Sequence, residues 1–359
     1  MANKYKRIII KIGSNVLTQK NGLPDSARIS HLVDQIAAIK KQGKEVILVS
    51  SGAVASGRSL IKIDEKVNAV AARQLLASIG QVKLINTYAH LFEHYQVICS
   101  QVLVTKEDFR DRMHYLNMKN CLEILLQHGV IPVVNENDVV SVTELMFTDN
   151  DELAGLIASM LNAQALIILS NVDGIFDGDP KTEGARVIEE IDGGAINFNS
   201  FISSERSAFG RGGMLTKSNM AQKVAQLGIA VHIANGTREN ILTDVLDGKV
   251  VHTRFIPSKN TSGKKKWIAH SENFAKGIVQ VNEGAKAMLT SSKATSLLPV
   301  GIINISDEFQ KGDIIKLVDE AGKQIGLGIA EYGSDKARER IGQKKQKPLV
   351  HYDYLYLNS

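Results

Sequence analysis

The chain alternates short apolar runs with longer stretches whose apolar residues recur at helical spacing. Runs rich in Ile and Val are typical of buried strands, and apolar residues at every third or fourth position are typical of amphipathic helices. We expect strands at residues 7–12, 45–53, 96–104, 130–138, 165–176 and 229–236, and helices at 26–43, 67–79, 81–94, 112–128, 149–161, 217–227 and 239–246. Ser26 is the expected N-cap of the first of these helices. This alternation predicts an α/β fold, a three-layer αβα sandwich with a mostly parallel sheet.

Polar clusters follow four of the expected strands, at the point where each strand ends. They are Lys11-Ile12-Gly13-Ser14, Ser50-Ser51-Gly52, Asn135-Glu136-Asn137-Asp138 and Ser170-Asn171. Ligands of open α/β sheets bind at the carboxyl ends of the strands. One polar strand end would mean little, but four of them predict a ligand site at this edge of the sheet.

The pattern changes after about residue 248. The sequence FIPSKNTSGKKKW at 255–267 has the Pro, Ser, Gly and Lys content of a linker. Beyond it, short alternating strands are expected near 277–282, 301–306, 313–319 and 324–332, with small helices at 283–291 and 334–341. We therefore predict a main domain over residues 1–255, a linker over 256–274 and a small, mainly β domain over 275–359.

Composition is that of an ordinary globular protein with room for two domains. The chain has 359 residues, of which 44% are hydrophobic and 23% charged, and its net charge is +5. Residues 261–359 hold fifteen Lys or Arg and eleven Asp or Glu, so most of the positive surplus lies there. A surplus of this size favours a solvated surface over a nucleic-acid interface.

The cysteines and the N-terminus favour a cytoplasmic protein. Cys99 and Cys121 cannot form a disulfide framework, and their apolar surroundings predict buried, unreactive side chains. The first apolar run is too short for a signal peptide, and no stretch approaches the length of a membrane span.

The first strand carries a lysine in an otherwise apolar run. Burying Lys11 is costly unless its ammonium group reaches solvent or meets an anion, and for Lys11 alone reaching solvent is the simpler explanation. Gly13 and Gly52 follow strands and could offer backbone N–H groups to an oxyanion, although tight turns explain them equally well.

A cluster of acidic residues opens one predicted helix. Thr148 and Asp151 have the spacing of a capping box, and Asp149 and Glu152 suit the positive end of the helix dipole. Capping accounts for one acid but not for the whole cluster, which lies close to the acidic strand end at Asp138. Paired acidic ends predict a cation site, for Mg²⁺ or for the ammonium group of a substrate.

The sequence GRGGMLTK, residues 210–217, has glycines and a lysine that suit a phosphate. It is not a P-loop, because that motif has a glycine directly before the lysine and Thr216 stands there. Taken alone, the segment fits a plain surface loop as well as a nucleotide loop.

Two other kinds of chemistry find little support. The histidines lack metal-ligand spacing except His90 and His94, which we interpret as helix surface because H-E-x-x-H is absent. The sequence also lacks the G-x-S-x-G elbow of serine hydrolases.

Six segments occur in this order along the chain: KIGSNV, VSSGAVASG, VVNENDVVS, FTDNDELA, LSNVDGIFDGDP and GRGGMLTK. Together they resemble the amino acid kinase family, in its glutamate 5-kinase branch. The resemblance covers essentially the whole chain, because the C-terminal part resembles the PUA domain that many of these enzymes carry. A KFGGTS or KLGG start would instead indicate aspartokinases or N-acetylglutamate kinases.

The resemblance implies ATP-dependent phosphorylation of the γ-carboxylate of L-glutamate to γ-glutamyl phosphate, for proline synthesis. Lys11 and Lys217 would neutralise the transferring phosphoryl group, and Asp151 would orient both lysines. The positions that match glutamate-binding residues are Ser51, Asn135, Asp138 and Asn150, with Asp138 as partner of the ammonium group. The positions that match ATP-binding residues are Lys11, Gly13, Gly52, Ser170, Asn171, Arg211, Gly212, Gly213, Met214, Leu215, Thr216 and Lys217.

The resemblance also implies Mg²⁺ on ATP, feedback inhibition by proline, and assembly into dimers or tetramers. Three residues depart from the family's usual pattern. Asn15 replaces Ser, Asn171 replaces Asp and Arg211 replaces Thr, so these departures bear on the details of nucleotide binding and leave Lys11, Lys217 and Asp151 unchanged.

Two alternatives stay open at this point. The PUA-like tail and its KKKW sequence are compatible with RNA binding, although the tail has a modest positive surplus and no aromatic stacking run. A kinase of the same fold could also act on a different acid, but the paired NEND and DND sequences favour a substrate with a free amino group.

Overall fold

The computed structural model describes residues 5–357 except 65, 142–145, 148, 180, 181, 183, 194–212, 259–267, 269–274 and 292–294. The chain forms two compact units, Met1–Asn260 and Thr261–Ser359. None of the described helices combines the length and apolar character that crossing a lipid bilayer requires.

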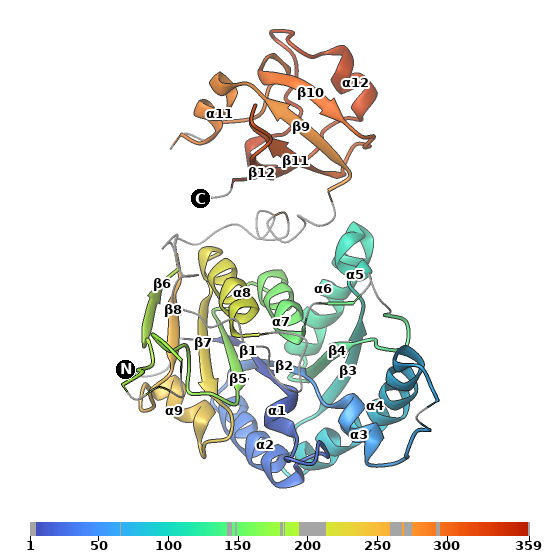
Figure 1. Ribbon diagram of the computed structural model, residues 1–359, viewed down its shortest axis with the longest axis vertical. Coiled ribbons are helices and arrows are strands. Elements are labelled where there is room, and N and C mark those ends of the chain that lie inside the picture. The colour runs from blue at the N-terminus through green and yellow to red at the C-terminus, as the bar shows by residue number, and fades with distance from the viewer. Residues whose placement is uncertain are drawn as a thin grey trace. The chain divides into compact units, whose positions relative to one another are not determined.

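The first unit is built on one sheet with the strand order β3-β4-β2-β1-β5-β7-β8-β6 (Figure 1). Its strands are β1 (Arg7–Ile12), β2 (Glu45–Ser50), β3 (Cys99–Val104), β4 (Ile131–Glu136), β5 (Ala165–Ser170), β6 (Glu190–Asp192), β7 (Ala230–Asn235) and β8 (Thr253–Ile256). All neighbours pair in parallel except β7 and β8. The predicted mostly parallel sheet is confirmed, and the carboxyl ends of β1 to β5 meet at one edge.

Helices cover both faces of this sheet, as Figure 1 shows. They are α1 (Ser14–Leu17), α2 (Ser26–Lys41), α3 (Ala53–Arg58), α4 (Ala69–Glu93), α5 (Glu107–Arg110), α6 (Arg112–Gln127), α7 (Asn150–Met160), α8 (Met214–Gln226) and α9 (Ile241–Asp247). Residues of α2, α4 and α9 share one hydrophobic cluster with alternate residues of β1. α7 packs against β1, β2, β4 and β5 without joining that cluster, so it lies on the opposite face.

The alternation of β1 decides where its lysine lies. Ile8, Ile10 and Ile12 point into the cluster beneath α2 and α4. Successive side chains of a strand point to opposite faces, so Ile9 and Lys11 point towards α7. A sheet buried on both faces therefore places one ammonium group against the start of a helix.

Two helix predictions need correction. α2 begins after Asp25, whose carboxylate accepts a hydrogen bond from Arg28 N, and not after Ser26. The stretches predicted at 67–79 and 81–94 form one helix, α4, that runs through Gly80. A Cβ at residue 80 would lie 1.9 Å from the carbonyl oxygen of Ala53. The glycine thus allows close packing of α3 on α4 and does not break the helix.

The edge of the sheet beyond β7 is longer than the sequence indicated. Phe255 and Ile256, placed at the start of the expected linker, belong to β8, and Phe255 is fully buried. Ser258 N also donates to Ala225 O at 3.0 Å, which ties this segment to α8. The remainder of the expected linker lies almost entirely outside the described residues.

The second unit has a five-stranded sheet in the order β10-β9-β11-β12-β13. Its elements are β9 (Gly277–Val281), α11 (Glu283–Leu289), the 3₁₀ turn Pro299–Gly301, β10 (Ile302–Ser306), β11 (Ile314–Val318), β12 (Gln324–Ile329), α12 (Ser334–Glu339), the 3₁₀ turn Tyr352–Tyr354 and β13 (Leu355–Leu357). β9 and β11 pair in parallel and the other neighbours antiparallel. The mainly β domain is confirmed, and β13 is the strand that the sequence reading missed.

Candidate active site

Two lysines from distant parts of the chain bind one carboxylate at the edge of the first sheet. Lys11 Nζ lies 2.6 Å from Asp151 Oδ1, and Lys217 Nζ binds Asp151 Oδ2. Lys11 comes from β1, and Asp151 and Lys217 come from the first turns of α7 and α8. The three residues are 6%, 1% and 8% exposed, so their charges are almost completely removed from water. The structure brings together all three predicted catalytic residues.

Burial and charge oppose each other in this cluster. Burial by itself would raise the pKa of Asp151, but Lys11 and Lys217 hold that pKa well below its ordinary value. Burial lowers the pKa of Lys11, and Asp151 opposes that shift. The carboxylate is therefore ionised at neutral pH. Two cations that share one anion retain positive charge for a further anionic partner, such as a phosphoryl group.

The acidic cluster around Asp151 is organised differently from the predicted cation site. Asp149 caps α7 by accepting hydrogen bonds from Asp151 N and Glu152 N, at 2.9 and 3.0 Å. Glu152 lies 3.5 Å from Lys106 Nζ. Thr148, proposed as the cap, lies outside the described residues. Burial and the neighbouring Asp151 raise the pKa of Asp149. Over the described part of the chain, no group of three His, Cys, Asp or Glu side chains could hold a metal ion.

A network of amides lies directly beside the charged cluster. Asn150 Nδ2 donates to Ser51 Oγ and to Asn135 Oδ1, each at 3.0 Å. Asn135 Nδ2 donates in turn to Gln81 Oε1 at 3.0 Å. Three of the four predicted glutamate-binding residues therefore form one hydrogen-bonded group. Gln81 was missed, although a glutamine on the buried face of α4 is a signal that the sequence contains.

The fourth predicted substrate residue, Asp138, follows β4 and is bound by an arginine. Arg73 Nη2 lies 2.5 Å and Arg73 Nε 3.1 Å from Asp138 Oδ1. Gln74 Nε2 donates to Val139 O at 2.7 Å and fixes the same loop. Arg73 was also missed, because a charged residue near the start of an amphipathic helix is usually solvated. The charge that Asp138 was expected to offer to a substrate is shared with a protein side chain in this structure.

Two glycines shape the backbone at the strand ends. Gly13 N donates to Leu169 O at 3.2 Å, and a Cβ at residue 13 would lie 3.2 Å from that oxygen and 3.4 Å from Lys11 Nζ. Gly52 precedes α3 with φ = 106°, a left-handed conformation that favours glycine. Next to Gly13, the Asn15 side-chain oxygen is buried and has no hydrogen-bond partner among the described residues.

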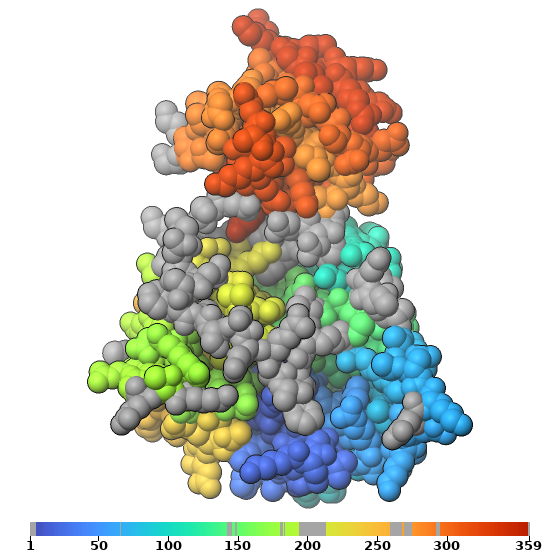
Figure 2. Space-filling model, viewed as in Figure 1, coloured from blue at the N-terminus to red at the C-terminus, as the bar shows by residue number. Residues whose placement is uncertain are grey.

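The predicted nucleotide end is described only in part. Gly213 precedes α8, and Met214, Leu215 and Thr216 form the turn of α8 that leads to Lys217. Figure 2 shows part of α8, in yellow, at the surface of the first unit. Arg211 and Gly212 lie outside the described residues. Gly213 has no side chain to cap α8, so the first N–H groups of this helix suit an anion.

The end of β5 carries the remaining nucleotide candidates. Ser170 ends the strand and Asn171 is exposed. Nearby, Asp173 accepts hydrogen bonds from Asn235 Nδ2 at 2.9 Å and from Arg238 Nε and Nη2 at 2.8 and 2.7 Å. The sequence reading missed this group, which ties the loop after β5 to the end of β7.

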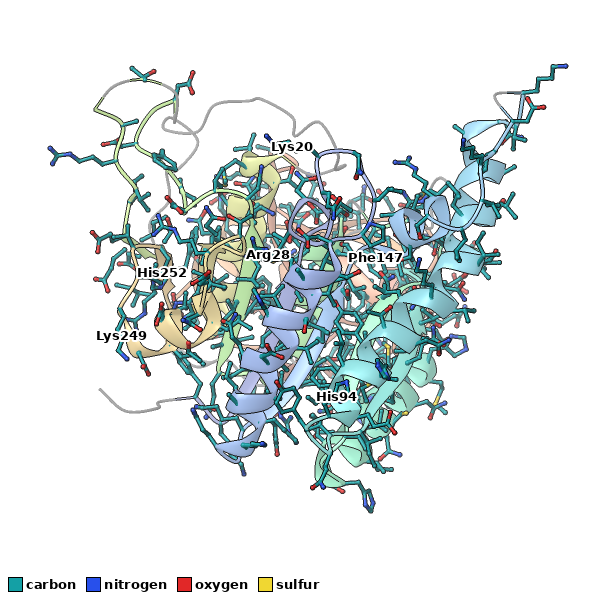
Figure 3. The ribbon with its side chains drawn as sticks, turned by 90° about the horizontal axis from the view of Figure 1, so that it is seen from below. Lys20, Arg28, His94, Phe147, Lys249 and His252 are labelled. Carbon is teal, nitrogen blue, oxygen red and sulfur yellow. The ribbon has the colours of Figure 1, made fainter. Side chains whose placement is uncertain are left out.

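Two minor predictions have opposite outcomes. Cys121 is exposed and Cys99 half-buried, so the expectation that both are buried is wrong. His90 and His94 lie on the exposed surface of α4, as expected, and His94 is labelled in Figure 3.

Comparisons with known proteins agree with the fold. The sequence model of the amino acid kinase family matches residues 6–235, and that of the PUA domain matches residues 277–352. The structure of carbamate kinase from Giardia lamblia aligns with a TM-score of 0.51 at 20% identity, over 71% of this chain and 99% of that chain, which shows a shared fold. The chain belongs to the amino acid kinase family and carries a PUA domain.

Full-length relatives narrow this class further. Glutamate 5-kinase from Bacteroides thetaiotaomicron is 55% identical, over 99% of this chain and 100% of the relative. Glutamate 5-kinase from Chlorobaculum tepidum is 53% identical, over 98% of each chain. The protein therefore falls within the glutamate 5-kinase branch of the family, and the resemblance read from its sequence is confirmed.

Proposed function

We propose that this protein transfers the γ-phosphoryl group of ATP to the γ-carboxylate of L-glutamate, giving γ-glutamyl phosphate in the first step of proline biosynthesis. The observation that carries the proposal is the buried carboxylate of Asp151 held between Lys11 and Lys217. Full-length relatives named glutamate 5-kinase support the choice of substrate.

The reaction brings a carboxylate towards a polyphosphate of like charge. Catalysis then depends on positioning and on neutralising negative charge in the transition state. Lys11 and Lys217 reach the phosphoryl group from two elements, and Asp151 holds both ammonium groups in place. Asp151 is not a general base, because a γ-carboxylate is already ionised at neutral pH.

The substrates would occupy the two halves of the strand edge. Ser51, Asn135 and Asn150 form the amide network beside Asp151, where we place glutamate, with Asp138 near its ammonium group. The start of α8, Ser170 and Asn171 would contact ATP. Mg²⁺ would enter on ATP as part of the substrate, coordinated by phosphate oxygens.

Proline inhibition, self-association and a cytoplasmic location belong to the same proposal. Proline resembles a cyclised glutamate and should compete for the amide network. Inhibition by millimolar proline that is relieved by glutamate would support this regulation, and indifference to proline at every glutamate concentration would remove it. Sedimentation of the purified protein would distinguish a dimer or tetramer from a monomer.

The direct test is an acyl phosphate assay. Purified protein, MgATP and hydroxylamine are incubated with L-glutamate, L-aspartate or N-acetyl-L-glutamate, and the hydroxamate is measured together with ADP. Glutamate-dependent hydroxamate is the expected result. Product with another acid in place of glutamate would leave the fold assignment unchanged and would contradict the proposed substrate. Absence of product with all three acids would favour the alternative that the second unit binds RNA, for which salt-sensitive RNA binding is the test.

A further inference from the structure

Arg73 of α4 forms an ion pair with Asp138, the predicted substrate residue that follows β4. Both bonds from Arg73, at 2.5 and 3.1 Å, go to the same oxygen of Asp138. The side chain of Asp138 is 8% exposed, whereas that of Arg73 is 35% exposed. Arg73 therefore holds a buried carboxylate with one edge of its guanidinium group, while part of its side chain stays in contact with solvent.

The guanidinium group of Arg73 has N–H donors that form no hydrogen bond to the described residues. Arginine carries five N–H donors in a planar fork. Its Nε and Nη2 bind Asp138, Nη2 lies 3.9 Å from Glu136, and Nη1 forms no hydrogen bond to any described residue. A half-buried arginine whose N–H donors are only partly used suits a second carboxylate, because a guanidinium group can bind one in planar, bidentate geometry.

The helix that carries Arg73 also touches the amide network. Arg73 and Gln81 lie two turns apart on the same side of α4, and Gln81 binds Asn135. Arg73 binds Asp138, which follows β4 directly after the segment that contains Asn135. One rigid helix therefore spans the site from the amides to the ion pair. The light-blue segment that includes the start of α4 reaches the surface in Figure 2.

The chemistry of the substrate matches this pair. An α-amino acid carries an ammonium and a carboxylate group on the same carbon, and both are charged at neutral pH. Asp138 offers the charge that suits the ammonium group and Arg73 the charge that suits the carboxylate. In the absence of substrate the two side chains neutralise each other, so neither leaves an unpaired buried charge.

We propose that Arg73 binds the α-carboxylate of the amino acid substrate while Asp138 binds its α-ammonium group, so that this ion pair selects α-amino acids. The inference rests on the proposed function. It adds to that function the protein side chain that recognises the α-carboxylate of glutamate. Arg73 is a substrate-binding, specificity-determining residue in this scheme and takes no part in phosphoryl transfer.

Lys106 is another cation beside the acidic start of α7. Its ammonium group is 3.5 Å from Glu152, and its side chain is 12% exposed. Lys106 is thus more buried than Arg73 and is directed to the acid that follows Asp151. A Lys106→Met variant therefore serves as the matched control for the loss of a positive charge.

The test compares L-glutamate with 4-aminobutyrate, which is glutamate without its α-carboxylate. Both compounds carry the ammonium group and the reacting carboxylate, so they differ only in the group assigned to Arg73. Hydroxamate formation gives kcat/KM for each; where turnover of 4-aminobutyrate is too slow, its Ki against glutamate replaces it. Arg73→Met should lower kcat/KM for glutamate roughly 10- to 100-fold, the scale of a lost charge-assisted hydrogen bond. The same substitution should neither lower kcat/KM for 4-aminobutyrate nor raise its Ki.

The outcomes separate the possible roles of Arg73. An equal fall for both compounds would overturn the inference and make Arg73 a positioning residue for Asp138. Unchanged glutamate kinetics would overturn it as well, and so would a loss of preference in Lys106→Met but not in Arg73→Met. If thermal unfolding shows that Arg73→Met does not fold, Arg73→Lys replaces it in the test. Arg73→Lys keeps the positive charge and should give an intermediate preference for glutamate over 4-aminobutyrate. Absence of glutamate turnover in the wild type would instead remove the proposed function.

Discussion

The ammonium group of Lys11 lies 2.6 Å from Asp151 Oδ1, and neither side chain reaches solvent to any useful extent. Lys11 is therefore an internal cation held by an internal anion, and the idea that it extends to solvent is wrong. A buried pair of this kind is a weak source of stability, because desolvation offsets most of the attraction. Its value here is the fixed position of positive charge at the end of β1.

The second lysine of the cluster gives the first prediction. Lys217→Ala should reduce kcat at least about 100-fold, the scale for losing one preorganised group that stabilises charge in the transition state. Steady-state hydroxamate kinetics at saturating glutamate measure the effect. Lys249→Ala, which removes an exposed lysine paired with Asp247 on the surface, is the control. A normal kcat with a raised KM for ATP would reduce Lys217 to a binding residue.

The shared carboxylate gives a prediction on stability. Asp151→Asn leaves two buried lysines without their anion and should lower the free energy of unfolding at pH 7 by roughly 3 kcal/mol. The pKa of Asp151 is depressed in the folded protein, so its contribution is complete above the unfolded value of about 3.9 and is lost as pH falls below it. The gap between wild type and variant, followed by urea unfolding, should be constant from pH 5 to 8 and shrink in stronger acid. A gap that widened below pH 4 would contradict this assignment.

A chain of hydrogen-bonded aromatic groups around the buried His232 predicts a second dependence on pH. Tyr5 Oη lies 3.2 Å from His232 Nε2, His232 Nδ1 lies 2.9 Å from His252 Nε2, and His252 Nδ1 lies 2.8 Å from Val250 O. A carbonyl accepts only, so with neutral rings each group donates to the next, from Tyr5 to His232, to His252, to Val250. His232 points to the face of the sheet opposite Lys11. Figure 3 shows His252 well apart from Phe147, which lies shortly before α7 in the chain.

Burial, followed by His252 and Arg254, lowers the pKa of His232 to about 3. The unfolded chain binds a proton at this residue below about pH 6.5, so stability is complete above that pH and falls as pH decreases towards 3. Between pH 7 and 4.5 the loss from this group should be on the order of 2–3 kcal/mol. His232→Gln should flatten the decline of Tm over this range, whereas His90→Gln, on an exposed surface, should leave it unchanged. A decline of equal slope in all three proteins would exclude His232 as its source.

The contact between α3 and α4 gives a prediction on packing. A Cβ at residue 80 would lie 1.9 Å from Ala53 O and 2.4 Å from Gly57 N, both backbone atoms that cannot move aside cheaply. Gly80→Ala should therefore destabilise the protein by roughly 2 kcal/mol or more, in spite of the better helix propensity of alanine. Gly178→Ala has open space around it and is the control. Equal melting temperatures for the two variants would mean that α3 shifts freely.

Much of the fold could be predicted from the sequence, because local patterns decide it. Six of the eight strands described in the first unit, and the helix predicted at 112–128, begin within a few residues of their predicted positions. Gly80 led to a wrong prediction because a glycine inside a helical pattern usually indicates a break. In the structure Gly80 instead allows α3 to pack closely against α4. β6 and β8 were missed because they are short and complete a sheet edge only through pairing with β7.

The sequence by itself determined that polar residues gather at the carboxyl ends of parallel strands, since strand length and hydrophobic alternation are local properties. The sequence did not determine which acidic side chain pairs with which basic side chain or helix end. Four acids stand close together in the sequence, yet Asp151 binds Lys11 and Lys217, Asp149 caps α7, Asp138 binds Arg73 and Glu152 lies by Lys106. Those partners come from elements far apart along the chain. Only the order of strands and the packing of α4, α7 and α8 bring them within bonding distance, because buried charges must find partners wherever the folded core places them.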